Sequence, residues 1–570
     1  MASCPDLLNV LPDSLVVKIL GEAVHHAKAL VRCATVCKRF SRLVWQVPSL
    51  SLVSFGQVRG APWPQSDRSD ERIYCTGAEF FEIVDQAVCR MVDLRSLRVE
   101  CNTCYYCKSG FSIEAIESWL IHGGATLESL TLNTKGGRFW LNKESRGPLL
   151  ALVHRYCPRL EELEVGAMSE VFWDAMSILP YPWTSLRRLV LGGLELSGLQ
   201  TLLGFCPFLE ELVLYNCSGT ENKAEFRGLK SLRQLKLTVQ SNYDRVAVLS
   251  VVVKVPCLSK LTVVGGGVES VMLEGAHDLD SLELEVSEPR VGGVGNQDLP
   301  SLMITSDTRV RKLKVRSGSA RFGWTWHTLR GLLDRPPMSS LDTLALLNVM
   351  LCKCGPAFPA DPSMSGNDVD YTDVGTVNHV YSNMAAVHPS ELCACLCFGH
   401  LRHLEIWAFP LLSLAMGIRE STCARAEEGG GCAKAEGMVV KQSSSNSLMR
   451  SSGSFQLHAP YLESLKIRGL IMQLLCAAEQ LDVMLLAFME NCPMLKNVRV
   501  EATCIGPWQG NRKMYQALVE KLGYLQNRFG AVFQVRRIVS LDNVIKPAPQ
   551  PAVTPCSRCL SNKPSSTLVR

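Results

Sequence analysis

A short leucine-rich phrase recurs through most of this chain of 570 residues. It is clearest as CPRLEELEV at Cys157–Val165 and as CPFLEELVL at Cys206–Leu214. Counted from the first leucine of the phrase, positions one, four and six are apolar, and this spacing is typical of a half-buried β-strand. The phrase starts at Leu94, Leu127, Leu160, Leu186, Leu209, Leu232, Leu258, Leu279, Val310, Leu341, Leu401, Leu462 and Leu495. Most successive copies lie 21 to 33 residues apart, and such a period predicts a solenoid of stacked repeats.

Amphipathic segments precede several copies of the phrase. Apolar residues have helical spacing in 149–156, 199–206 and 481–488, each directly before a strand phrase. Neither element buries its apolar face alone, so stacked copies should form parallel strands on a concave side and helices on the outer side. The predicted fold class is α/β, a curved solenoid. The shorter units that start at Leu232 and Leu279 are expected to contain little helix.

Bulk composition restricts the classes of partner. Hydrophobic residues make up 47% of the chain and charged residues 20%, which favours a large folded core over general disorder. The net charge of +5 is small for this length, so no general attraction to nucleic acid or to a membrane surface is expected. The apolar runs 246–255 and 470–489 are too short, or too interrupted by charge, to span a bilayer. We expect neither nucleic acid nor membrane among the partners.

The 24 cysteines do not by themselves indicate a secreted disulfide protein. The N-terminus lacks a basic stretch followed by an apolar one, and Asp6 and Asp13 lie where a signal peptide would be apolar. Cys157, Cys206 and Cys492 occupy a small apolar position before the strand phrase, which burial explains. The expected compartment is reducing, the cytoplasm and/or the nucleus.

Three cysteine clusters invite comparison with zinc sites. They are Cys101, Cys104 and Cys107; Cys352 and Cys354 with Cys393, Cys395 and Cys397; and Cys556 with Cys559. Structural zinc takes four ligands, usually from two closely spaced pairs. The first cluster supplies three, and the second has the less usual C-x-C spacing, so we predict reduced cysteines, with no metal and no cofactor. No motif of a phosphate-binding loop, a nucleophile elbow or a zinc protease occurs, so we predict no catalytic residues and no enzyme.

A different pattern precedes the repeats, in the segment LPDSLVVKILGEAVHHAKALVRCATVCKRFSRLVW. Pro12 and Asp13 suit the first turn of a helix, where proline loses no hydrogen bond and a carboxylate meets the positive end of the dipole. Leu15, Ile19 and Leu20 follow at helical spacing, and a second apolar set comes later. A small helical bundle that exposes some apolar residues is expected.

This segment resembles the F-box. The resemblance is carried by Leu11, Pro12, Leu15, Ile19, Leu20, Val36, Cys37, Lys38, Phe40 and Trp45. The intervening GEAVHHAKAL departs from the family pattern, and the repeats resemble cysteine-containing leucine-rich repeats. Together these resemblances imply the substrate-recognition subunit of an SCF-type cullin E3 ubiquitin ligase, which binds an adaptor subunit and, through it, cullin, while the repeats hold a protein substrate. The implied adaptor-binding residues are Leu11, Pro12, Leu15, Ile19, Leu20 and Val36.

Alternation within the strands predicts which residues face a partner on the concave surface. The candidate substrate or ligand residues are Tyr215, Lys236, Lys260, Lys312, Lys314, Arg316, Trp407, Lys466, Arg468 and Arg499. One interpretation is a site for an acidic or phosphorylated ligand, with Tyr215 and Trp407 as anchors. The other is that lysines and arginines solubilise exposed strand positions.

Two alternatives to a receptor for protein substrates stay open. Some plant F-box repeat proteins sense a small acidic ligand, and this chain is compatible with a plant source and with that mode of action. A leucine-rich-repeat scaffold without any ligase role is the other alternative. The expected organisation is an F-box-like module at 5–50, a solenoid at 75–510 with inserted loops at about 352–397 and 418–456, a C-terminal cap at 511–545 and a disordered tail at 546–570.

Overall fold

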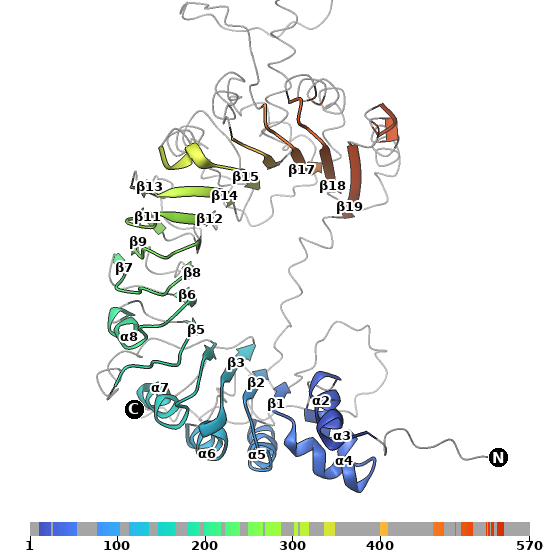
Figure 1. Cartoon of the computed structure of the whole chain (residues 1–570), viewed down its shortest axis with the longest axis vertical. Coiled ribbons are helices and arrows are strands. Elements are labelled where there is room, and N and C mark those ends of the chain that lie inside the picture. Colours follow the sequence, from blue (N-terminus) through green and yellow to red (C-terminus); the bar gives the residue numbers. More distant parts are fainter. Residues whose placement is uncertain are drawn as a thin grey trace, which may run out of the picture. The chain divides into compact units, whose positions relative to one another are not determined.

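The computed structural model describes a little under half of the chain (Figure 1). The described residues are 11–23, 27–53, 77–102, 113–135, 146–166, 181–193, 196, 199–217, 223–239, 249–265, 268–286, 301–305, 308–317, 336–347, 400–407, 460–471, 485, 489, 492–504, 520, 523–524, 526–528, 530 and 533–540. They group into two compact units, one that reaches His277 and one that starts at Asp278. The expected inserted loops and tail lie outside the described residues.

Short helices open the first unit. They are α2 (Asp13–Ala23), α3 (Ala27–Ala34), α4 (Lys38–Leu43) and the 3-10 turn η1 (Val44–Gln46). The carbonyl of Pro12 accepts the amides of Leu15 and Val16 at 3.0 and 3.1 Å, so the helix starts where the proline predicts. Val16 and Leu20 lie one turn apart and are buried, so this face of α2 packs inward.

A parallel sheet follows in the same unit. Its strands, in spatial order, are β1 (Ser49–Val53), β2 (Ser96–Asn102), β3 (Ser129–Lys135), β4 (Glu162–Val165), β5 (Arg188–Gly192), β6 (Glu211–Cys217), β8 (Gln234–Val239) and β10 (Lys260–Gly265). The second leucines of the phrase stand opposite one another from strand to strand, as at Leu97, Leu130 and Leu163. All three are buried, and they form one continuous core layer.

Helices lie between the first strands in sequence. They are α5 (Gly77–Val88), α6 (Ile113–Gly123) with the 3-10 turn η2 (Gly124–Thr126), α7 (Arg146–Tyr156) and α8 (Leu199–Phe205). Figure 1 shows α5 to α8 along one side of the strands. The helices predicted in 149–156 and 199–206 are confirmed, because α7 and α8 cover these ranges.

Strands replace helices further along the first unit. They are β7 (Lys223–Arg227), β9 (Leu249–Lys254) and β11 (Val268–Leu273), which pair in parallel. The general prediction of outer helices is wrong before Leu258, where the β-branched run of β9 forms a strand. The prediction of little helix before Leu232 is confirmed.

The second unit continues the same pattern. Its parallel strands, in spatial order, are β12 (Asp278–Val286), β14 (Arg309–Ser317), β15 (Thr343–Leu347), β16 (His403–Trp407), β17 (Ser464–Ile471), β18 (Asn497–Cys504) and β19 (Phe533–Ser540), with β13 (Ser301–Ile304) and the 3-10 turn η5 (Pro336–Ser340) between them in sequence. Within the expected C-terminal cap at 511–545, β19 pairs with β18. Residues 520, 523–524 and 526–528 of the same segment are helical.

All thirteen copies of the phrase form strands, each of which begins within two residues of the first apolar position. A backbone link joins neighbouring copies: the carbonyl of Glu128 accepts the amides of Glu161 and Glu162 at 2.8 and 3.0 Å, and Arg187 and Glu210 do the same for the repeats that follow them. The protein is therefore a mixed α/β protein with many parallel strands, compatible with an α/β solenoid. No helix of the described residues is long and apolar enough to cross a bilayer.

Candidate functional site

An apolar surface lies on the N-terminal helices. Leu15 and Ile19 lie one turn apart on α2 and are 41% and 45% exposed, so they share one face of the helix. Val36, directly after α3, is 65% exposed, and Val31 on α3 is 51% exposed. Large aliphatic side chains at this exposure are candidates for contact with a partner.

The other implied adaptor-binding residues are not equally accessible. Pro12 is exposed and Leu11 is half-buried. Leu20 is only 5% exposed, because it lies on the inward face of α2 together with Val16. Its side chain contributes to the packing of the module, while Leu15 and Ile19 present the exposed surface.

An ion-pair cluster ties the start of α2 to α4. The Asp13 carboxylate accepts from Arg39 and Arg42, each at 2.7 Å, and Arg39 also donates to the carbonyl of Leu11. The hydrogen bond from Arg39, with the charge of both guanidinium groups, holds the pKa of Asp13 below its ordinary value. This cluster sets the angle between the two helices, and sequence spacing alone does not reveal it because the partners are 26 and 29 residues apart.

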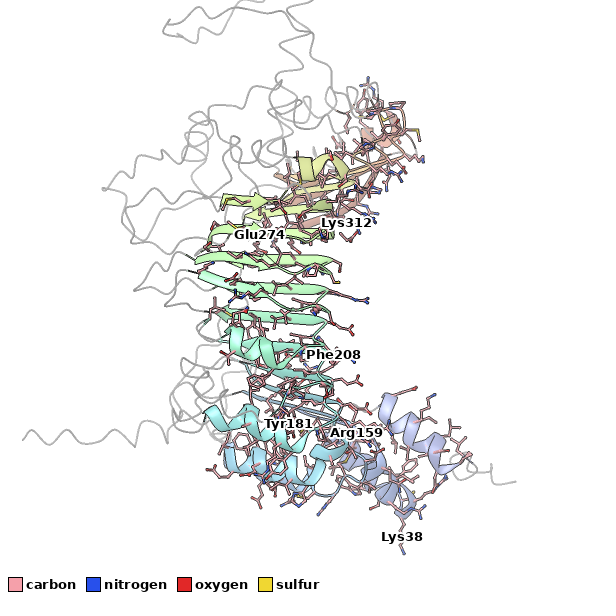
Figure 2. All side chains as sticks on the ribbon, turned by 60° about the vertical axis from the view of Figure 1, so that its left-hand side comes forward. Lys38, Arg159, Tyr181, Phe208, Glu274 and Lys312 are labelled. Carbon is pink, nitrogen blue, oxygen red and sulfur yellow. The ribbon has the colours of Figure 1, made fainter. Side chains whose placement is uncertain are left out.

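Half of the predicted basic residues are neutralised within the sheet. Lys312, labelled in Figure 2, is 3.1 Å from Asp280, and Lys314 pairs with Glu283. Arg316 pairs with a carboxylate of the same strand β12, Glu285, at 3.7 Å. Lys466 lies between two carboxylates of the neighbouring strands, at 3.3 and 3.2 Å. Exposed pairs of this kind contribute little to stability, but they cancel much of the charge that an acidic ligand would meet.

Lys236 and Lys260 differ from these residues because they form no ion pair with the described part of the chain. They lie on neighbouring strands β8 and β10 and are exposed, and they line a small hollow together with Gln234 and Thr262. Among the described residues, no carboxylate lies within 4.0 Å of either ammonium group. These two residues keep the ligand-binding potential that the sequence assigned to the whole basic set.

Tyr215 lies flat across two glycines of neighbouring strands. A Cβ atom at Gly192 would overlap the Tyr215 ring, and one at Gly166 would lie 2.7 Å from the tyrosine hydroxyl. Gly166 also leaves room for the amide of Asn133, which the same Cβ atom would overlap. The ring is half-buried, so it forms a fixed aromatic platform on the outward face of the sheet.

The remaining candidates are placed as follows. Trp407 and Arg468 belong to β16 and β17 and stand opposite each other, but their side chains lie outside the described residues. Arg499 lies opposite Lys466 on β18, and its Nε atom is buried without a hydrogen-bond partner. Neither Tyr215 nor Arg499 lines the hollow beside Lys236 and Lys260.

The cysteine clusters weighed as zinc sites lie outside the described residues, apart from the backbone of Cys101 in β2. Within the described ranges, no group of three or more histidine, cysteine, aspartate or glutamate side chains is arranged to hold a metal ion. Two surfaces therefore stand out, the exposed apolar face of α2 and the outward face of the sheet. Compared with known proteins, the chain matches no family model, and it matches no curated protein.

Proposed function

We propose that this protein is the substrate-recognition subunit of an SCF-type cullin E3 ubiquitin ligase. In this proposal, the helices of residues 13–46 form an F-box module that binds the adaptor. The parallel strands line the concave side of a curved leucine-rich-repeat solenoid with outer helices, and they bind a protein substrate. The observation that carries the proposal is the exposure of Leu15 and Ile19 on one face of α2, at positions that match the F-box pattern.

The N-terminal helices suit a docking role because α2 has one buried apolar face and one exposed apolar face. Val16 and Leu20 are buried, whereas Leu15 and Ile19 stay 41% and 45% exposed, so partner binding need not disturb the module's own packing. Asp13 with Arg39 holds the helix in place. A stable contact of this kind buries about 800 Å² on each partner. The exposed aliphatic residues would form its centre and polar neighbours its rim; these aliphatic residues are Leu15, Ile19, Val31 and Val36.

The chain would act by proximity and not as an enzyme. Holding a substrate on the same complex as the ubiquitin-carrying subunit raises the effective concentration of the substrate's lysines. Chemistry then belongs to other subunits, and this chain needs no catalytic residue or cofactor. A ligase subunit of this kind would work in the cytoplasm and/or the nucleus.

The experiment is co-purification of the adaptor and cullin with full-length protein. Wild type should retain both. The double variant Leu15→Asp, Ile19→Asp should retain at least about tenfold less adaptor than wild type, because charges then replace the apolar contact. Ile121→Asp is the matched control, since Ile121 of α6 is an exposed aliphatic residue outside the N-terminal helices, at 56% exposure. Failure of the wild type to retain the adaptor would leave the scaffold alternative in place.

The small-ligand alternative loses most of its support. Its basic residues Lys312, Lys314 and Arg316 each pair with a carboxylate of β12, so a small acidic molecule would have to displace these partners. A receptor for protein substrates does not require that displacement.

A further inference from the structure

Outward-facing basic residues of the sheets differ in whether a carboxylate pairs with them, and Arg499 of β18 forms no such pair with the described residues. Six of them form ion pairs with carboxylates: Arg98, Arg188, Lys312, Lys314, Arg316 and Lys466. Lys236 and Lys260 form none with the described residues. Most lysines of this surface thus have a local partner that accounts for them, while these two adjacent ones have none.

The two lysines belong to a block of four hydrogen-bond donors. Lys260 stands opposite Gln234, and Thr262 stands opposite Lys236, so the lysines occupy one diagonal of the block. Neighbouring parallel strands lie about 4.8 Å apart and rise about 3.3 Å per residue, so these diagonal neighbours lie about 8 Å apart at the backbone, a span that the flexible lysine side chains can bridge. Both ammonium groups can therefore reach one anion held between them, with the Gln234 amide and the Thr262 hydroxyl as further donors.

A hollow lies at this block. It has a volume of about 80 Å³, and Thr262, only 5% exposed, forms part of its floor. The nearest carboxylate in its lining is Glu211, which pairs with Arg188 of β5 at 3.3 Å and is thus already neutralised. Pockets for whole ligands measure roughly 300–1,000 Å³, so this hollow suits one charged group at the end of a side chain.

We propose that Lys236, Lys260, Gln234 and Thr262 bind a phosphate monoester carried by a protein partner. A phosphate dianion has two charges to match two lysines and three oxygens to accept from four donors, whereas a carboxylate has one charge and two oxygens. Because the hollow accepts only one group, the rest of the ligand must run along the open face of the sheet, as a polypeptide can. This inference rests on the proposed function in one respect: it gives the chemistry of the substrate that the repeats would hold.

Binding of a phosphopeptide to full-length protein tests the proposal. The probe is a short alanine- and glycine-based peptide with one central phosphoserine and a fluorescent label, followed by anisotropy. Changing Lys236→Gln and Lys260→Gln together should weaken binding by at least about tenfold, because two charge-assisted contacts are lost. The matched control, Lys312→Gln with Lys314→Gln, also removes two exposed lysines, but these already pair with carboxylates, and it should change binding by less than about twofold.

Lysine labelling of the wild type gives a readout that does not depend on a variant. The phosphopeptide should slow reductive methylation of Lys236 and Lys260 and leave Lys312 unchanged. Three outcomes would overturn the proposal. They are equal protection of all three lysines from methylation, an equal loss of phosphopeptide binding in both double variants, and no binding of the phosphopeptide by wild type. Equal binding of the same peptide with glutamate at the central position would overturn the phosphate specificity, and equal protection by inorganic phosphate alone would overturn the protein partner.

The assay contains no adaptor, so its outcome is separate from that of the co-purification. A protein that binds the phosphopeptide without retaining the adaptor keeps this site and loses the ligase role. A protein that retains the adaptor, with no difference between the two lysine variants, keeps the ligase role and loses this site. Adaptor capture by the Lys236→Gln, Lys260→Gln variant should equal that of wild type.

Discussion

Two consecutive repeats of the first unit have the same length and different outer elements. From Leu186 to Leu209 and from Leu209 to Leu232 the chain advances 23 residues each time. The first repeat contains helix α8 and the second contains strand β7. Repeat length therefore does not decide the outer element.

Apolar spacing accounts for the difference. In α8, Leu199, Leu202 and Leu203 are buried, which is the spacing of one helical face. In β7, Ala224 and Phe226 are buried and their neighbours are exposed or half-buried, which is the alternation of a strand. The two elements also meet, since the Gln200 side chain of α8 donates to the Glu225 carbonyl of β7 at 2.7 Å. We call a repeat helix-backed when its outer element is a helix and strand-backed when it is a strand. A strand-backed repeat can thus follow a helix-backed one while the inner strands β5, β6 and β8 stay paired in one sheet.

The largest test of this comparison is removal of the buried aromatic ring of β7. Phe226 is fully buried, so Phe226→Ala should destabilise the first unit by about 3–5 kcal/mol. Leu203→Ala in α8 is the helix-backed counterpart and should lose about 2–5 kcal/mol. Urea denaturation measures both, and hydrogen exchange of the β8 amides localises the effect. A loss below about 1 kcal/mol for Phe226→Ala would mean that the outer strand contributes little to the core.

A second test concerns the outward face of the sheet, where the repeats that start at Leu160 and Leu186 have Gly166 and Gly192 and the strand-backed repeats have Thr238 and Val264 at the matching positions. Gly192→Ala should destabilise the protein by about 1–3 kcal/mol, because the new methyl group overlaps the Tyr215 ring. In a double-mutant cycle with Tyr215→Ala most of this loss should disappear. Additive losses would show that the ring does not lie on Gly192.

A third test uses pH, because His154 of α7 is a buried histidine of the helix-backed part. Its ring lies 4.4 Å from that of Tyr181, beside α7 in Figure 2, and 5.4 Å from that of Trp183. Burial lowers the pKa of His154 from 6.5, although a backbone hydrogen bond at Tyr181 opposes this. The unfolded chain therefore takes up the proton first, and the free energy of unfolding should fall as pH drops below about 6.5 until the lower folded-state pKa is passed.

Two variants check the pH effect. His154→Phe should remove this part of the pH dependence, and His122→Phe, at an exposed position of α6, should keep it. The measurement is the urea midpoint at several pH values, compared as slopes because His154→Phe also changes packing. An unchanged slope in His154→Phe would exclude His154 as its source.

The test with the smallest expected effect uses the unmodified protein. Helices α7 and α8 are each followed by CP, with Cys157 and Cys206 buried, whereas the outer strand β9 is followed by VPC, with Cys257 exposed. Burial raises the pKa of Cys157 and Cys206 to about 12, so their thiolate is scarce at pH 8. Iodoacetamide should alkylate Cys257 in the native protein and the other two only after unfolding, as mass spectrometry would detect. Early modification of Cys206 would contradict its core position.

Much of the fold was predictable because the apolar patterns that specify its strands lie within short segments of the sequence. The period-two alternation around Leu163 or Leu235 lies within six residues, so the strands could be placed from the phrase alone. The strand β1 was missed because residues 5–50 were assigned to the F-box-like module, although Val47, Leu50 and Leu52 fill the same buried positions as the phrase. Little helix was expected before Leu232, but the outer strand at 223–227 was not predicted there, although the alternation of Ala224 and Phe226 already indicated it.

The candidate sites were less predictable, for a physical reason. The sequence by itself determined where the inner strands run and which residues face outward, because both follow from side-chain alternation along one segment. Only the tertiary structure decided which outward charges have partners, since Lys312 with Asp280 and Asp13 with Arg39 are 32 and 26 residues apart. Such pairs depend on the register between repeats and on the angle between helices, which no single segment specifies. Register separates the neutralised lysines of β14 from Lys236 and Lys260, and it brings Tyr215 to rest on Gly192.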